Sequence, residues 1–340
     1  MKAKPALLSV VLMMAASLLQ ADPLFDSDET LVLSLEGPFG LMGKDRDKEK
    51  SWPGVLSGEM GRFDVDLSLR GNRRLNKSVC EYPPLRLDFQ KKQIRNTVFA
   101  HQGDIKLVVQ CDYIKDYANY LRFEFLIYKA LNLLTTVSYQ VRWVEIVYSD
   151  PGAKPGSQER RMPAFFVERK SRLAKRLGSE ITDVTSIYAA TLAPEQASLL
   201  SLFQYVIGNP DYSLAAAAPG ESCCHNAKLL VAESGQYMPV IYDFDSAGLI
   251  NARYAKPADG LGIEKVTQRV YRGYCLHNGN LEVARAALVA KEEAIKALFQ
   301  NDEIVEERAK KRVLKFLEAS FKNIKTPKNF KRFVTGRCRG

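Results

Sequence analysis

The sequence predicts an α+β fold of two lobes, with a strand-rich N-terminal lobe and a mainly helical C-terminal lobe. Short segments that alternate apolar and polar residues, as half-buried strands do, fill the first half of the chain. Long amphipathic segments fill the second half. Apolar residues make up 46% of the 340 residues, enough for one large domain or two closely packed lobes. We expect residues 22–175 to form the first lobe and residues 176–340 the second, with a cleft between them.

The first 21 residues have the features of a secretory signal peptide. Lys2 and Lys4 precede a short apolar run that ends at Ala21, and an acidic segment follows. An uncleaved anchor is the alternative, because Leu19 is larger than is usual three positions before a cleavage site. No later segment reaches the ~20 apolar residues that a membrane span needs. We therefore expect a periplasmic or secreted protein with no membrane span after signal removal.

The alternating segments of the first lobe predict six strands and one helix. The strands are expected at 30–37, 63–72, 85–89, 105–111, 141–149 and 162–169, and the amphipathic helix at about 117–134.

The second lobe is expected to contain three helices and one hairpin. The first helix, 194–208, has Pro194 in its first turn and Gly208 at its end. The hairpin strands are expected at 227–232 and 237–242, and the later helices at 281–300 and 303–324.

The hairpin and the loop before it hold the polar residues that suggest chemistry. If Ala232 pairs with Tyr237 across a four-residue turn, Asn226 lies opposite Asp243. Directly opposed residues have Cβ atoms roughly 4.5–5.5 Å apart, close enough to share a divalent cation. Asp211, in the preceding loop, can reach the same place. One group to orient a hydroxyl and two oxygen ligands for magnesium are typical of phosphoryl transfer. A purely structural role is the alternative, since Asn and Asp also stabilise turns.

The six cysteines of an exported chain are expected to form disulfides. A zinc site is the weaker alternative, because the chain has no Cys-x2-Cys pair and no Cys/His ladder. We expect one bridge between neighbouring strands and one between the loop before Asn226 and the segment 271–275, with one vicinal cysteine and the last cysteine free. These bridges are Cys80–Cys111 and Cys223 or Cys224 to Cys275, which leaves Cys338 unpaired.

The formal charge of +10 is concentrated near the C-terminus. A basic stripe of this kind can bind nucleic acid or anionic lipid. We expect it instead to be the solvated face of a helix that packs inward through Val313, Phe316, Leu317 and Phe321. No specific nucleic-acid binding is expected.

From about residue 60 to residue 260 the chain resembles the atypical kinases typified by the spore-coat kinase CotH, and more distantly HipA-type kinases. The order of the segments carries the resemblance, and no single segment is highly specific. The segments are LRGN at 69–72, the strand and helix at 106–134, AFFVER at 164–169, IGNPD at 207–211, HN at 225–226 and YDFD at 242–245. The resemblance implies a two-lobed protein-kinase-like fold that uses ATP with Mg²⁺ or Mn²⁺.

The resemblance also implies roles for individual residues. Asp211 corresponds to the catalytic aspartate, and Asn226 and Asp243 correspond to the metal ligands, with Asp245 competing for the second metal role. Glu124 corresponds to the glutamate that pairs with the ATP-binding lysine.

The chain departs from the family at that lysine. The expected strand carries Arg86 and no lysine, and Lys106 on the next strand is a substitute. Arg86 can also clamp phosphate through its guanidinium.

Two functional hypotheses follow. In the first, the protein is an exported kinase that transfers phosphate from ATP to a hydroxyl of a protein or small molecule. In the second, it is a catalytically silent binding or scaffolding protein with a partner in the cell envelope. The scarcity of ATP outside the cytoplasm favours the second hypothesis, and the Asp211, Asn226 and Asp243 set favours the first.

Overall fold

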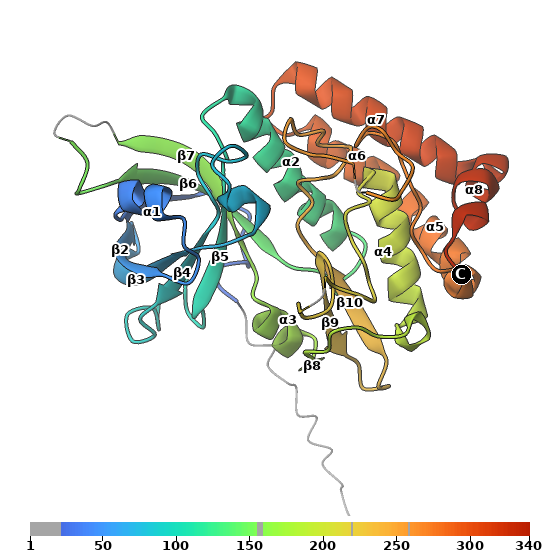
Figure 1. The fold of residues 1–340 in the computed structure, drawn as a ribbon, viewed down its shortest axis with the longest axis horizontal. Helices are drawn as coiled ribbons and strands as arrows, with labels where there is room; N and C mark the ends of the chain where they lie inside the picture. The colour runs from blue at the N-terminus through green and yellow to red at the C-terminus, as the bar shows by residue number, and fades with distance from the viewer. Residues whose placement is uncertain (1–21, 155–158, 219, 258) are drawn as a thin grey trace, which may run out of the picture.

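The computed structural model describes residues 22–154, 159–218, 220–257 and 259–340. Residues 1–21, which carry the signal-peptide prediction, lie outside the described residues. The described chain forms a β-barrel on one side and a group of helices with a small sheet on the other (Figure 1). None of the helices in the described ranges is long and apolar enough to cross a membrane.

Seven strands close into a barrel in the order β1-β2-β3-β4-β5-β7-β6. Closure depends on β1, which pairs antiparallel with β2 and parallel with β6. A short helix, α1 (Phe39–Asp45), connects β1 to β2. The strands are β1 Leu31–Glu36, β2 Ser51–Gly58, β3 Gly61–Leu69, β4 Leu85–Phe89, β5 Asp104–Val109, β6 Val141–Ser149 and β7 Arg160–Val167.

The predicted two-lobed protein-kinase-like fold is therefore wrong, because the strand-rich half is a closed barrel. The alternation of apolar and polar residues predicts where strands occur, but it does not say which strands pair. Contacts between β1 and β6 join residues more than 100 positions apart, such as Leu33 and Ile146. Both side chains are buried inside the barrel, where they contribute to a core of Leu, Ile, Val and Phe residues.

The second half contains helices and a three-stranded sheet in the order β10-β9-β8. The predicted helix 281–300 is two helices, α5 and α6, which meet at Lys291. The elements are α3 Lys170–Arg176, β8 Glu180–Ile181, α4 Pro194–Ile207, β9 Ala227–Val231, β10 Tyr237–Ile241, α5 Leu281–Ala290, α6 Glu292–Gln300, α7 Glu307–Lys325 and α8 Pro327–Phe333. The 3-10 helices are η1 Arg73–Leu75, η2 Ala189–Thr191, η3 Cys275–Asn280 and η4 Thr335–Arg337.

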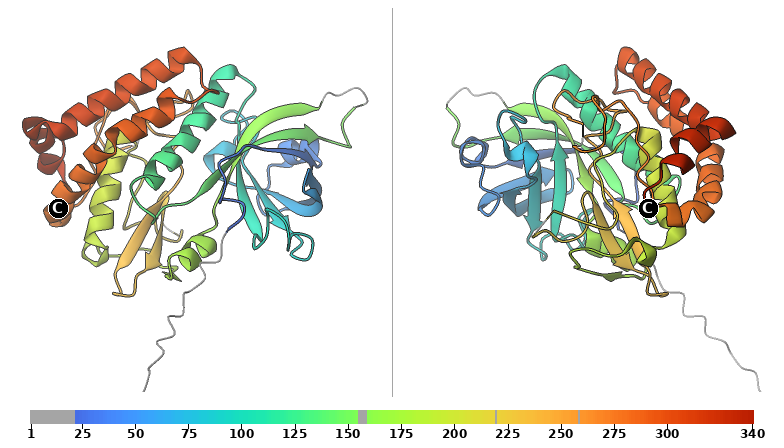
Figure 2. Two further views of the ribbon diagram at one scale, coloured as in Figure 1. Left: turned by 180° about the vertical axis from the view of Figure 1, so that it is seen from behind. Right: turned by 45° about the vertical axis from the view of Figure 1, so that its right-hand side comes forward.

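Helix α2 (Lys115–Asn132) lies between the two halves, as both views of Figure 2 show. The ring centroids of Phe125 and Trp143 of β6 lie 5.3 Å apart, and those of Phe123 and Phe299 of α6 lie 6.2 Å apart. All four rings are buried. Because one helix is embedded on both sides, it holds the barrel and the helical half in a fixed relation and can present side chains to both.

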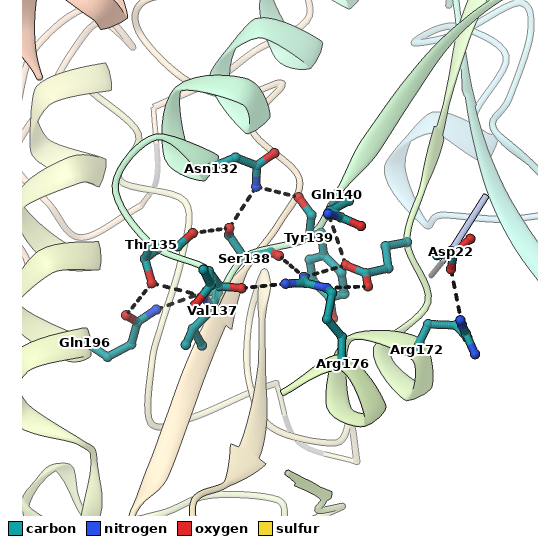
Figure 3. A network of polar contacts seen from close by, with 12 residues as sticks. Asp22, Asn132, Thr135, Val137, Ser138, Tyr139, Gln140, Arg172, Arg176 and Gln196 are labelled. Atoms are coloured by element: carbon teal, nitrogen blue, oxygen red, sulfur yellow. Dashed lines mark hydrogen bonds and ion pairs between the residues drawn. The ribbon is translucent and has the colours of Figure 1, made fainter. Parts of the chain in front are cut away.

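A polar network at the base of β7 reinforces this junction (Figure 3). The Nε and Nη2 atoms of Arg176 in α3 form a bidentate pair with the buried carboxylate of Glu168, at 3.0 and 2.8 Å. The same guanidinium donates to the carbonyl oxygen of Ser138 at 2.8 Å, and the Gln140 amide donates to Glu168 at 3.0 Å. The end of β7, the start of β6 and α3 are thereby locked together.

All six cysteines are paired, and one of the predicted bridges is confirmed. Cys80–Cys111 links the segment before β4 to the end of β5, as expected. The predicted bridge to Cys275 is wrong: the other pairs are Cys223–Cys224 and Cys275–Cys338. The C-terminal segment lies beside η3, where the Cys275 amide donates to the Arg339 carbonyl oxygen at 2.8 Å, and this brings Cys338 within reach. Three disulfides fit an extracytoplasmic protein.

Candidate functional site

The hairpin of β9 and β10 forms as expected, but its register differs from the prediction by one residue. Val231 pairs with Tyr237, and the Tyr242 amide donates to the Asn226 carbonyl oxygen at 3.0 Å. Asn226 therefore lies opposite Tyr242 rather than Asp243. The Ala232 amide donates to the Gln236 carbonyl oxygen at 3.0 Å, so the turn has three residues, 233–235, in place of four, and the φ of 79° at Gly235 allows it.

Asn226 and Asp243 nevertheless lie at the same end of the hairpin, where the chain leaves the sheet. Both residues have left-handed backbone conformations, with φ of 50° and 62°. Asn and Asp adopt this conformation more readily than most residues. The Tyr128 hydroxyl of α2 accepts a hydrogen bond from the Asp243 amide at 3.0 Å, which fixes the start of the departing loop.

Asp211 lies against this end of the hairpin, as predicted from its position in the preceding loop. The Asn226 side-chain amide donates to the backbone carbonyl of Asp211 at 2.8 Å and to its carboxylate at 3.2 Å. The His225 Nε2 atom lies 2.6 Å from the other carboxylate oxygen. Hydrogen bonds from His225 and Ser246 hold the pKa of Asp211 below its usual range despite burial, and Asp211 raises the pKa of His225.

A second group of charges surrounds Arg74 of η1, and we name it the Arg74 cluster: Arg74, Glu124, Asp243 and Asp245. The guanidinium lies 2.9 Å from Asp245, 3.1 Å from Asp243 and 3.6 Å from Glu124. The Asp243 side chain is 42% exposed, whereas that of Glu124 is 3% exposed. Glu124, predicted to pair with an ATP-binding lysine, thus contacts an arginine. Asp245, the predicted alternative metal ligand, is held by the same arginine.

Burial changes the protonation of this cluster. Desolvation raises the pKa of Glu124 to about 8, although Arg74 opposes the shift. Desolvation also raises the pKa of Asp245 to about 6, again against Arg74. At neutral pH, Arg74 is therefore balanced mainly by the two aspartates, and Glu124 is predominantly protonated.

Positive side chains surround Lys106, and we name them the basic side: Arg70, Arg86 and Lys106 of the barrel and Lys228 of β9. Lys106, on β5, has its Nζ atom 4.9 Å from the centroid of the Tyr242 ring. Desolvation and the charge of Arg70 lower the pKa of Lys106 to about 7, and Asp243 partly offsets the shift. Burial also lowers the pKa of Arg70. Each of these cations disfavours the charged form of its neighbours. A bound anion would favour the charged forms instead.

Arg86 lies at the edge of this group. It is directly opposite Lys106 in the barrel, where β4 pairs with β5. Its side chain is 49% exposed and its Nε atom lies 3.6 Å from Asp104. Its charge still contributes to the lowered pKa of Lys106. The structure therefore places Lys106 close to the hairpin and Arg86 nearer to solvent.

The residues proposed for Mg²⁺ or Mn²⁺ provide suitable atoms. Asn226 contacts Asp211 through its Nδ2 atom, so this contact does not use its Oδ1 atom. The Asp243 side chain is partly exposed. A carboxylate and an amide oxygen are ligands that Mg²⁺ accepts, usually with several waters. Among the described residues, no group of three or more His, Cys, Asp or Glu side chains is arranged to hold a metal ion.

Sequence reasoning missed Arg74, Arg70 and His225. Arg70 is within the LRGN segment quoted for the family resemblance, and His225 precedes the predicted metal ligand. Arg74 had no signal, because its partner Asp243 lies 169 positions away in the chain.

A cavity of about 450 Å³ lies elsewhere, on the barrel surface beside Gly37, Gly54 and Asp150, and none of the site residues line it. No protein-family model matches the chain, and a search of curated proteins finds no match.

Proposed function

We propose that this protein is an extracytoplasmic phosphotransferase that moves the terminal phosphate of ATP to a hydroxyl of a protein or small molecule. The observation that supports this most is the position of Asp211, held by Asn226 and His225 at the end of the hairpin that also carries Asp243. The resemblance to CotH-like kinases in the order of these residues is part of the same proposal. The resemblance extends to the site residues and not to the fold.

The charges divide the proposed site into two functional parts. Asp211 orients the substrate hydroxyl and accepts its proton while the hydroxyl oxygen bonds to phosphorus and the bond to the departing diphosphate breaks. Lys106 and Arg70 contact the phosphate oxygens, which restores the charged form of Lys106. Bound Mg²⁺ or Mn²⁺ would be held by Asn226 and Asp243 and would neutralise phosphate charge.

The second candidate is a binding or scaffolding protein of the cell envelope without catalysis. The Arg74 cluster favours it, because the guanidinium already neutralises Asp243 and Asp245 at 3.1 and 2.9 Å. A carboxylate satisfied by an internal cation binds a metal ion less readily. In this alternative, the basic side holds an anionic ligand that is not turned over.

A thermal-shift titration with ATP, with and without Mg²⁺ or Mn²⁺, combined with an assay of ADP formation, separates the candidates. At an ATP concentration of 100 times Kd with metal present, the phosphotransferase is expected to be stabilised by about 2.7 kcal/mol. The same ATP concentration without metal should stabilise it less. Lys106→Met is expected to lose this stabilisation. Asp211→Asn is expected to keep it but to lose ADP formation with a hydroxyl-containing acceptor.

Asp66→Asn is the matched control, since Asp66 is an exposed carboxylate on the outer face of β3. It should behave as the wild type does. ATP binding without ADP formation from any acceptor would favour the silent binding protein. No stabilisation by ATP, with or without metal, would contradict the phosphotransferase proposal.

A further inference from the structure

The positive charge of this protein is concentrated in its last 33 residues. From Arg308 to Gly340 the chain has 12 Lys or Arg residues and one acidic residue, Glu318. This segment therefore carries a formal charge of +11, whereas the whole chain carries +10. Because the remaining chain is close to neutral, an anionic partner would be attracted to this end of the molecule rather than to its whole surface.

Helix α7 aligns part of this charge in one row, which we name the basic stripe: Arg308, Lys311, Lys315 and Lys322. The four side chains recur at intervals of three, four and seven residues, so they share one helix face, which also carries the exposed Glu318 between Lys315 and Lys322. All four residues are exposed. The row spans roughly 21 Å at 1.5 Å per residue.

The opposite face of α7 belongs to the core. Val313, Leu317 and Ile324 are buried there and fix the rotation of the helix. Figure 2 shows α7 along the outer edge of the helical half. The basic stripe therefore faces outward because the core requires the other face, and it cannot turn inward without unburying these residues.

The stripe differs from its basic neighbours in its contacts. Lys310 pairs with Glu307 at 2.7 Å, and Lys325 pairs with Glu292 at 2.7 Å. Arg312 donates to two backbone carbonyls of the 249–250 segment at 3.0 Å. Within the described ranges, no carboxylate forms an ion pair with any of the four stripe residues. Their charges are available to an external anion.

The aromatic side chains of this region face away from the stripe. Phe321 is buried, and Arg269 covers the Phe316 ring at 3.8 Å from its centroid. Proteins that bind single-stranded nucleic acid stack bases on exposed aromatic rings, which the stripe does not offer. A straight row of long, flexible cations on a convex helix suits a flat anionic surface better.

We propose that the basic stripe, extended by the exposed Lys328 and Lys331 of α8, docks this protein onto a membrane surface rich in anionic lipid. The sequence alone favours a solvated helix face, and the structure adds the outward alignment and the absence of close ion pairs among the described residues. Each Lys or Arg near such a surface contributes about fivefold to binding, the equivalent of about 1 kcal/mol. The inference does not depend on the proposed function.

The test is sedimentation of the protein with vesicles of phosphatidylglycerol and phosphatidylcholine, compared with vesicles of phosphatidylcholine alone. We expect binding to the anionic vesicles only, and its loss at high salt, because salt screens exposed charges. The triple variant Lys311→Glu, Lys315→Glu and Lys322→Glu is expected to lose roughly 100-fold or more in partition coefficient. The corresponding Lys→Gln variant should show a smaller loss, and it serves if the Glu variant does not fold.

A matched control reverses the same number of charges elsewhere. Lys91→Glu, Lys92→Glu and Arg95→Glu alter three exposed residues of the barrel loop between β4 and β5. This variant should bind anionic vesicles within a few-fold of the wild type. Equal losses in both variants would indicate a general charge effect and overturn the proposal. Equal binding to neutral vesicles, or binding to DNA without binding to anionic vesicles, would overturn it as well.

Discussion

The Arg74 cluster and the basic side both have Asp243 as a neighbour, but they balance charge differently. In the Arg74 cluster, one guanidinium faces Asp243, Asp245 and the largely buried Glu124. On the basic side, Arg70 and Lys106 have lowered pKa values because burial and mutual repulsion outweigh the attraction of Asp243. The first group is complete within the chain, whereas the second would gain from an anion. We therefore expect the first to stabilise the fold and the second to bind the ligand.

Removal of Arg74 is expected to have the largest effect on stability. Arg74→Met leaves the largely buried carboxylate of Asp245 without its cation. Loss of one partner of a buried ion pair costs about 3–5 kcal/mol. Urea unfolding at neutral pH measures this loss.

Arg73→Met is the control for that substitution, since Arg73 is the adjacent, exposed arginine of η1. Its loss should stay near or below about 1 kcal/mol. If both variants lose equally little, the Arg74 cluster is hydrated in solution, and the contrast between the two groups fails.

The pH dependence of stability provides a smaller test of the same cluster. The pKa of Glu124 is raised to about 8, so the folded protein holds a proton there that the unfolded chain releases near pH 4.5. The contribution of Glu124 to stability is therefore present below about pH 4.5 and is lost as the pH rises from about 4.5 to about 8. The expected slope is about 1 kcal/mol per pH unit.

Glu124→Gln removes the titrating group, so the stability of wild type relative to this variant should fall between pH 5 and pH 8. The exposed Glu195→Gln, in the first turn of α4, should keep the wild-type profile. A constant difference between wild type and Glu124→Gln over this range would mean that Glu124 stays ionised in the folded state.

The sequence predicted the local parts of this site better than the assembly. Helix α4 ends at Gly208 in the left-handed conformation, as its position predicted. The β9–β10 hairpin was predicted from short-range signals, but its register depends on the conformation of one glycine, Gly235. Barrel closure through β1 and β6 depends on long-range pairing, for which a single sequence carries no local pattern.

The same distinction explains which site residues were found. Asp211, Asn226 and Asp243 were predicted because they lie within one segment of 33 residues and share a hairpin. Arg74 was missed and Glu124 was named only through the family resemblance, because they reach the site from a 3-10 turn and from α2, and only the tertiary fold brings them together. Lys106 was predicted as a substitute for a missing lysine, and its place beside Tyr242 supports a role at the site.

The smallest expected effect is a change in the titration of His225, which tests whether Asp211 is engaged as the structure has it. The hydrogen bond from Asp211 raises the pKa of His225 above its ordinary value of about 6.5, whereas burial lowers the pKa of His277. The chain has three histidines, so NMR titration can resolve them. A raised pKa means that His225 stabilises the fold below pH ~6.5 and loses this contribution at higher pH. Asp211→Asn should move the His225 titration down toward 6.5 and leave His277 unchanged. If His225 titrates at or below its ordinary value in the wild type, Asp211 is not held by His225, and the proposed arrangement around the substrate hydroxyl is wrong.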